Sequence, residues 1–206
     1  MKLSIENLAL NRGERRVLEG VDAVFERGKV TAILGAAGAG KALLLRAIAG
    51  RADADAGHVR LGGRLIGRLG RAERARAVAL VERDRHRLLG RGSADLAAAL
   101  VARPDWLLAE DPLSALDPAA QFARIAQLRA AAGQGMGIVV ALADPVLAAR
   151  VADAVLLLGG GRMIAFGAPG EALAHQPLRA AFGVEVMMIG DAQGRLLPVP
   201  IGCLPA

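Results

Sequence analysis

The feature that most constrains this sequence is the stretch Gly35-Ala36-Ala37-Gly38-Ala39-Gly40-Lys41-Ala42, which lies between two apolar segments. Residues 30–34 are short, apolar and partly β-branched, which predicts a buried strand. Residues 43–49 are mostly good helix formers. A strand, a glycine-rich turn and a helix in this order are the context in which G-x-x-x-x-G-K binds phosphate through backbone N–H groups and the lysine ammonium. The stretch therefore predicts a phosphate-binding loop, and a glycine-rich turn without a ligand is the alternative.

One position of this loop departs from the pattern. The full pattern ends in Ser or Thr, whose hydroxyl ligates magnesium. Here that position is Ala42, and its methyl group cannot ligate a metal. The sequence therefore predicts a bound nucleotide with a weakened magnesium site.

Length and composition limit the classes of protein that need to be considered. The 206 residues suit one α/β domain, and 54% of them are hydrophobic, which is ample for a core. The net charge of +6 comes almost entirely from arginine, most densely between residues 64 and 91, and either a solvated surface or a nucleic-acid-binding surface fits this cluster. Aromatic residues make up only 2%, which argues against stacking on bases, so no nucleic acid is expected as a partner. The single Cys203 excludes an internal disulfide framework.

The chain order predicts alternating strands and helices, and hence a parallel sheet with helices on its faces. A helix over 119–132 is expected to end at Gly133. We expect one main domain over residues 1–167. Residues 168–206 read as a small C-terminal appendage, with a helical segment interrupted at Pro177 and then two strands.

Two further motifs follow the phosphate-binding loop. Residues 104–118, Pro-Asp-Trp-Leu-Leu-Ala-Glu-Asp-Pro-Leu-Ser-Ala-Leu-Asp-Pro, form an apolar strand, an acidic pair and a loop. Residues 159–167 read Gly-Gly-Gly-Arg-Met-Ile-Ala-Phe-Gly, a glycine turn between two strands. The phosphate-binding loop resembles the Walker A segment, and residues 104–118 resemble the Walker B and D-loop segments, of the nucleotide-binding subunits of ATP-binding cassette (ABC) transporters. Residues 159–167 resemble a glycine-turn hairpin of the same family. The tail, residues 181–186 and 194–200, is similar to that of subunits serving iron-siderophore, haem and cobalamin importers.

The resemblance implies a P-loop NTPase fold, with an ABC-type mixed sheet and helices on its faces. It implies a cytoplasmic subunit at the inner face of the cell membrane, bound to permease subunits and served by a periplasmic binding protein. Two nucleotide-binding subunits, identical or different, would enclose ATP and Mg²⁺ between them. No apolar run is long enough to span a bilayer, so contact with the membrane requires these partners.

The resemblance also assigns roles to particular residues. Residues 35–42 would hold the phosphates and Arg12 the adenine, with Glu82 at the loop that senses the γ-phosphate. Glu110 would support magnesium, and Asp111 would polarise the attacking water. Ser114 and Asp117 would contact the second subunit.

Several of these positions depart from the family pattern. In place of the family residue, this sequence has Arg12 instead of an aromatic residue, Ala42 instead of a hydroxyl residue, Glu82 instead of glutamine, Glu110-Asp111 instead of the reverse order of acids, and Ala143 instead of histidine. Because the two acids are exchanged, the side chain at each position differs from the family's by one methylene, which shifts the carboxylate. A shift of about 1 Å can cost about a hundredfold in rate. A carboxylate at Glu82 is expected to repel phosphate. The Leu-Ser-Gly-Gly-Gln type signature is not recognisable; residues 89–93 are the nearest candidate, and the interval near 82–92 is too short for the family's helical subdomain.

Three hypotheses follow. The chain is an ABC-type ATPase subunit of a metal-chelate importer, or a degraded homologue that does not hydrolyse ATP and has a regulatory or no transport role. The third is a basic nucleic-acid-binding module that uses the arginines of residues 64–91. The substitutions favour impaired or lost hydrolysis on an ABC-type fold. Asp144 is expected to cap the following helix, and the isolated histidines are not expected to bind metal.

Overall fold

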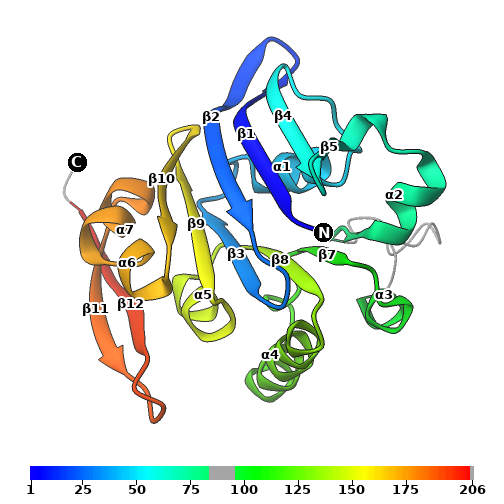
Figure 1. The fold of residues 1–206 in the computed structure, drawn as a ribbon. Helices are drawn as coiled ribbons and strands as arrows, with labels where there is room; N and C mark the ends of the chain where they lie inside the picture. Colours follow the sequence, from blue (N-terminus) through cyan, green and yellow to red (C-terminus); the bar gives the residue numbers. More distant parts are fainter. Residues whose placement is uncertain (84–95, 205–206) are drawn as a thin grey trace.

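A six-stranded sheet in the order β10-β9-β3-β8-β7-β6 forms the centre of the molecule (Figure 1). The structure is a computed structural model, and it describes residues 1–83 and 96–204. The strands are β3 (Val30–Gly35), β6 (Val78–Val81), β7 (Trp106–Glu110), β8 (Gly137–Leu142), β9 (Ala154–Gly159) and β10 (Arg162–Gly167). All neighbouring pairs are parallel except β9 and β10, which form an antiparallel hairpin at the edge. The sheet is therefore mixed, as predicted.

The central strands are apolar on both faces because a layer of the protein covers each face. In β3, Val30, Ala32 and Leu34 face one core, whereas Ile33 faces the other. All of them are fully buried, which explains why this strand reads as a continuous apolar run rather than as an alternating one.

The layer on one face consists of a second, antiparallel sheet and helix α1 (Lys41–Ile48). Its strands, in the order β2-β1-β4-β5, are β1 (Leu3–Arg12), β2 (Arg15–Phe25), β4 (Ala56–Leu61) and β5 (Arg64–Leu65). The turn η1 (Ile66–Arg68) and helix α2 (Arg71–Ala77) then lead back to β6. Trp106 lies fully buried between the two sheets, and its Nε1 donates to the carbonyl of Met1 at 3.1 Å. This hydrogen bond of the indole ties the start of the chain to β7.

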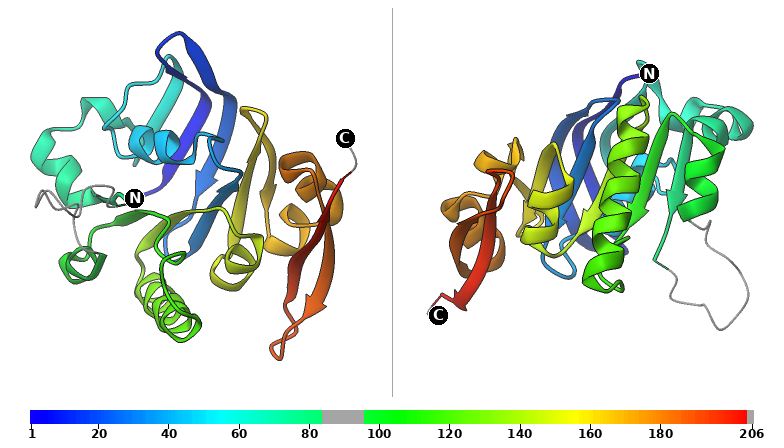
Figure 2. Two further views of the ribbon diagram at one scale, coloured as in Figure 1. Left: turned by 180° about the vertical axis from the view of Figure 1, so that it is seen from behind. Right: turned by 90° about the horizontal axis from the view of Figure 1, so that it is seen from below.

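Helices α3 (Leu96–Ala102), α4 (Pro118–Gly133) and α5 (Pro145–Val151) cover the opposite face (Figure 2). Helix α4 ends at Gly133, where the sequence predicted its end. The chain leaves the helix two residues later at Gly135, whose φ of +95° suits glycine. Asp144 caps α5, since its Oδ1 accepts from the backbone N–H groups of Val146 at 2.7 Å and Leu147 at 3.2 Å, as predicted.

The C-terminal segment packs against the edge of the central sheet. It contains α6 (Pro169–Ala172), α7 (His175–Phe182) and the hairpin of β11 (Val184–Gly190) and β12 (Leu196–Cys203). The interruption expected at Pro177 was wrong: Pro177 lies in the first turn of α7, where a missing N–H is tolerated, and the break precedes His175. The hairpin is held on α5 by Arg195, whose Nη1 donates to the carbonyl of Arg150 at 2.9 Å.

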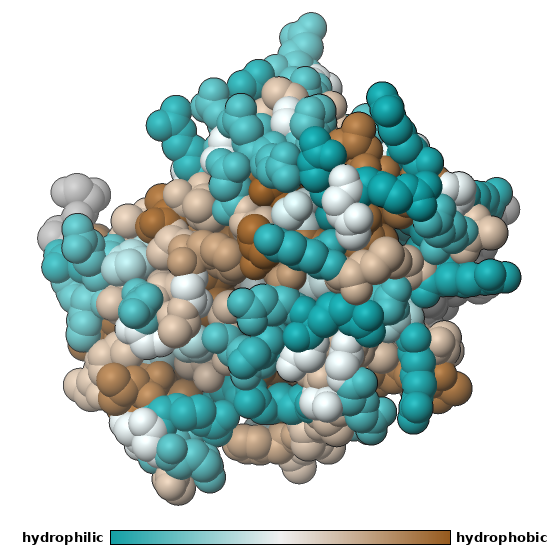
Figure 3. Space-filling model, in the orientation of Figure 1, coloured by the Kyte–Doolittle hydropathy of each residue, from teal (hydrophilic) through white to brown (hydrophobic). Residues whose placement is uncertain are grey.

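On the face shown in Figure 3, hydrophilic side chains are interspersed with apolar ones, some of which lie toward the C-terminal hairpin. The exposed apolar residues of this hairpin are Met187, Ile189, Leu196 and Ile201. Among the described residues, no helix has both the length and the apolar character needed to cross a membrane.

Candidate functional site

The glycine-rich stretch forms a tight turn between β3, which ends at Gly35, and α1, which begins at Lys41. Gly38 and Gly40 have φ angles of +82° and +90°, a region that favours glycine. A Cβ atom on Gly35 would lie 2.8 Å from the carbonyl oxygen of Leu158, and one on Gly40 would lie 2.8 Å from Cγ of Leu18. Glycine is therefore required here for space as well as for backbone conformation. The predicted order of strand, turn and helix is confirmed.

The ammonium group of Lys41 is folded back over this turn. Its Nζ donates to the carbonyl of Gly35 at 2.6 Å and to that of Ala36 at 2.8 Å. Burial lowers the pKa of Lys41 below the usual lysine value, although the nearby carboxylates of Asp111 and Glu110 act in the opposite direction. An ammonium has three donors, so one remains to bind an anion at the mouth of the turn.

The turn lies in an open cleft of about 1420 Å³. The cleft is bordered by the carboxyl ends of β6, β7 and β8, by the β9–β10 turn and by the β1–β2 hairpin. The carboxyl ends of the strands are where ligands bind in open α/β sheets. The predicted site residues that line the cleft are Arg12, residues 36–42, Glu82, Glu110 and Asp111, together with Ala143. The structure thus brings together predicted residues that lie up to about 100 positions apart in the chain.

The acidic pair at the end of β7 is held by hydrogen bonds. Asp111 has a φ of +51°, and its N–H donates to the carbonyl of Ala141 at 2.9 Å. Its Oδ2 accepts from Nη1 of Arg83 at 2.9 Å and from Oγ of Ser114 at 2.7 Å. Oε2 of Glu110 accepts a long hydrogen bond, 3.4 Å, from the backbone N–H of Arg83. A single residue, Arg83, therefore contacts both carboxylates.

Glu82 is also paired within the cleft. Its Oε1 accepts from Nε of Arg46 at 2.6 Å, and its Oε2 lies 3.6 Å from Nη1 of Arg51. Two guanidinium groups therefore compensate its negative charge. The repulsion of phosphate expected from a carboxylate at this position is offset by these two arginines.

Ser114 and Asp117 do not line the cleft. Ser114 binds Asp111, as described above, and Asp117 caps α4, with Oδ1 accepting from the N–H of Ala120 at 2.8 Å. Both residues are exposed, and their contact with a second subunit stays a prediction. Residues 89–93, the candidate signature, lie outside the described residues, as does His86, whereas His58 and His175 are exposed.

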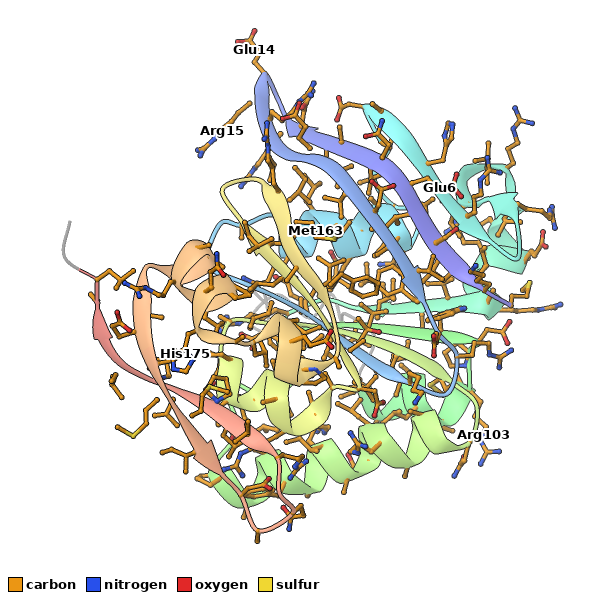
Figure 4. The ribbon with its side chains drawn as sticks, turned by 60° about the vertical axis from the view of Figure 1, so that its left-hand side comes forward. Glu6, Glu14, Arg15, Arg103, Met163 and His175 are labelled. Atoms are coloured by element: carbon orange, nitrogen blue, oxygen red, sulfur yellow. The ribbon has the colours of Figure 1, made fainter. Side chains whose placement is uncertain are left out.

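Sequence reasoning missed five arginines that line the cleft: Arg15, Arg16, Arg46, Arg51 and Arg83. Figure 4 shows Arg15 extending from the tip of the β1–β2 hairpin, whereas Met163 lies over β10 nearer the centre of the molecule. Three of the arginines follow predicted site residues closely in the chain, since Arg15 and Arg16 come after Arg12, and Arg83 comes after Glu82. This adjacency was an available signal, but it does not reveal which way a side chain points.

Comparison with protein families and known sequences identifies relatives of the whole chain. A family model described as ABC transporter matches residues 18–132. The hemin import ATP-binding protein HmuV of Pseudomonas fluorescens Pf-5 is 32% identical over 240 aligned positions, which cover 90% of this chain and 94% of the relative. The protein of the same name from Pseudomonas aeruginosa PAO1 is also 32% identical, with the same coverage.

Solved structures show the same fold. CbiO1 of Clostridium perfringens, part of the ABC transporter complex cbiONQ, superposes with a TM-score of 0.72 over 85% of this chain and 92% of its own, at 21% identity. A chain from a transporter described as being of the metal-chelate type, in an inward-facing conformation, has a TM-score of 0.76 at 18% identity and covers 97% of both chains. The fold predicted from the phosphate-binding loop is therefore confirmed.

Proposed function

The chain belongs to the ABC transporter family of ATP-binding proteins, and from this premise we propose that it is the nucleotide-binding subunit of an importer of haem or another metal chelate, with impaired or lost ATP hydrolysis. The names of its relatives support the class of cargo, since the HmuV proteins are named for hemin import. The tail resemblance to iron-siderophore, haem and cobalamin importers points in the same direction.

Nucleotide binding rests on one observation, the intact loop between Gly35 and Lys41. Its backbone turns at Gly38 and Gly40, and it leads into the N-terminus of α1. The ammonium of Lys41 lies over the loop and donates to the carbonyl of Gly35. This arrangement presents N–H groups and positive charge to an anion. The residues present therefore fit the phosphates of ATP.

The same residues do not fit the magnesium ion that usually accompanies ATP. Ala42 contributes no oxygen, and Asp111 is already paired with Arg83. In the part of the chain that the structure describes, no three His, Cys, Asp or Glu side chains gather closely enough to hold a metal ion. We therefore place a weakened magnesium site here and derive no step through the metal.

The residues expected around the attacking water, Asp111 and Ala143, support the loss of hydrolysis. A general base must have a free oxygen to take the proton of the water. Oδ2 of Asp111 already accepts two hydrogen bonds, which leaves Oδ1 to take the proton, and Ala143 offers only a methyl group where the family has histidine. Losing one donor to a developing charge costs about 3–4 kcal/mol of transition-state stabilisation. Together with the shifted carboxylates, these losses favour a subunit that holds ATP without rapid turnover.

The proposed subunit lacks most of the family's helical subdomain. The alignment with HmuV spans 240 positions, whereas this chain has 206 residues, so the relative contains residues that have no counterpart here. We place the deletion near residues 82–92, within the main domain of residues 1–167. Residues 168–206 form the C-terminal appendage of the same domain, and their Leu178 and Leu197 share the core beneath α4 and α5.

The partners proposed are permease subunits, a periplasmic binding protein and a second nucleotide-binding subunit, identical or different. CbiO1, which shares this fold, is described as part of the ABC transporter complex cbiONQ. Ser114 and Asp117 are exposed beside the cleft and are proposed to contact the second subunit. The subunit would then act on the inner face of the membrane through its permease partner.

A phosphate-release assay tests the loss of hydrolysis. We expect the purified chain to bind labelled ATP and to release phosphate from MgATP no faster than a protein-free control. Asp111→Asn should leave that background unchanged. Ordinary turnover that disappears in Asp111→Asn would show that Asp111 acts as the base and that the chain is an active ATPase subunit. Absence of ATP binding would instead refute the nucleotide site.

A further inference from the structure

We propose that Arg83 takes the place of the magnesium ion in the nucleotide site, so that this chain binds metal-free ATP. The inference rests on the proposed nucleotide-binding function and concerns the ionic form of the nucleotide. Its basis is the contact of Arg83 with both carboxylates of the acidic pair.

Arg83 contacts one oxygen of each carboxylate that a metal would need, through its guanidinium at Asp111 and through its backbone N–H at Glu110. Its Nη1 lies 2.9 Å from Oδ2 of Asp111, and its backbone N–H lies 3.4 Å from Oε2 of Glu110. The Asp111 side chain is only 19% exposed, and Ser114 fixes the same oxygen at 2.7 Å. A guanidinium pairs with a carboxylate strongly and cannot lose its proton, so it is a permanent positive charge at this point.

A second set of observations concerns the ligands that remain. The hydroxyl that would ligate magnesium from the start of α1 is absent, because residue 42 is alanine. Glu82 is not free to replace this hydroxyl as a magnesium ligand, since Arg46 and Arg51 already bind its carboxylate. Both oxygens of Glu82 are therefore paired with arginines of the chain.

The charge of the cleft fits the metal-free nucleotide. Among the described residues that line it, seven cationic side chains face three carboxylates, an excess of four positive charges. The cations are Arg12, Arg15, Arg16, Lys41, Arg46, Arg51 and Arg83. Free ATP is more negative than its magnesium complex by the charge of the ion, so it has more to gain in a cleft with this excess. The arginines thus supply the neutralising charge that the metal usually supplies.

An ordinary surface ion pair would not have this effect. Exposed pairs contribute little to stability and serve no ligand. Arg64, at the start of β5 and outside the cleft, forms such a pair with Glu73, and its side chain is 59% exposed, close to the 57% of Arg83. Arg64→Ala therefore removes the same group from a matched environment outside the cleft, and it serves as the control.

The test is a titration of fluorescently labelled ATP against the whole chain, in millimolar magnesium and in a metal chelator. The wild type should bind with the same affinity, within about twofold, in both conditions. Arg83→Ala should bind about tenfold more weakly in chelator, because the substitution removes a permanent, partly exposed positive charge from beside Asp111. Magnesium should recover most of that loss, since Asp111, freed from the guanidinium, can then hold the ion together with Glu110. Arg83→Lys should keep binding independent of magnesium, and Arg64→Ala should behave as the wild type.

Each other outcome refutes a specific statement. Wild-type binding that requires magnesium would overturn the replacement by Arg83 and leave the nucleotide site standing. Equal weakening of Arg83→Ala in both conditions, or no weakening, would also overturn it, because Arg83 would then be a simple phosphate contact or none. No binding in either condition would overturn the nucleotide site itself. If Arg83→Ala fails to fold in thermal unfolding, the wild-type comparison and Arg83→Lys still decide the question.

Discussion

The Lys41→Met substitution tests the group on which nucleotide binding depends. Methionine keeps a long apolar side chain but removes the ammonium that lies 2.6 Å from the carbonyl of Gly35 and 2.8 Å from that of Ala36. The backbone of the turn is set by its glycines, which this substitution leaves in place. Any loss of affinity therefore reports the missing charge rather than a changed loop.

The size of the effect follows from the donors of Lys41. Two of its three N–H groups are used within the turn, which leaves at least one for phosphate. One hydrogen bond to a charged group is worth about 1.5–3 kcal/mol. Because each 1.4 kcal/mol is about tenfold in affinity, Lys41→Met should weaken ATP binding about 10- to 150-fold.

The assay is the same labelled-ATP titration, with Lys29→Met as the matched control. Lys29 is an exposed lysine at the far end of β3, outside the cleft, so its substitution should leave affinity unchanged. ATP prefers the protonated ammonium, and the pKa of Lys41 is lowered by burial. Affinity should therefore fall as the pH rises through that lowered pKa, below the range of an ordinary lysine, and Lys41→Met should show no such fall. Equal affinities of Lys41→Met and wild type would refute the reasoning.

Two further predictions concern stability. Gly40→Ala should lower the free energy of unfolding more than Gly38→Ala. Both positions have a positive φ, which costs alanine about 1–2 kcal/mol, but only at Gly40 would the new Cβ lie 2.8 Å from Leu18. Equal losses in urea unfolding would show that this steric contribution is absent. Asp144→Ala should lower the free energy of unfolding by about 1 kcal/mol, because it removes the cap of α5, and it should leave ATP affinity unchanged. A drop in ATP affinity would mean that Asp144 contributes to the site.

The elements of the fold could be predicted because each is specified by neighbouring residues. The apolar run before Gly35 predicts β3, the helix formers after Lys41 predict α1, and Asp144-Pro145 marks the start of α5. The misplaced break in the C-terminal segment was local as well, because Pro177 is accommodated in the first turn of α7.

The candidate site was predictable only in part. The glycine loop, Lys41 and the acidic pair are recognisable because each forms a motif along the chain. The partner of each carboxylate is not, because Arg83 lies 28 residues from Asp111, and Arg46 lies 36 residues from Glu82. Such pairs form only when the ends of β6 and β7 and the side chains of α1 come together beside the cleft.

The sequence by itself determined that this chain would contain a phosphate-binding loop on a buried strand, because the glycines, the lysine and the apolar flanks act over a few residues. Only the tertiary structure decided how the charges in the cleft are distributed: the strand order places Arg83 on the acidic pair and two further arginines on Glu82. Electrostatic interactions depend on distances in space, and residues far apart in the chain reach those distances only in the folded molecule.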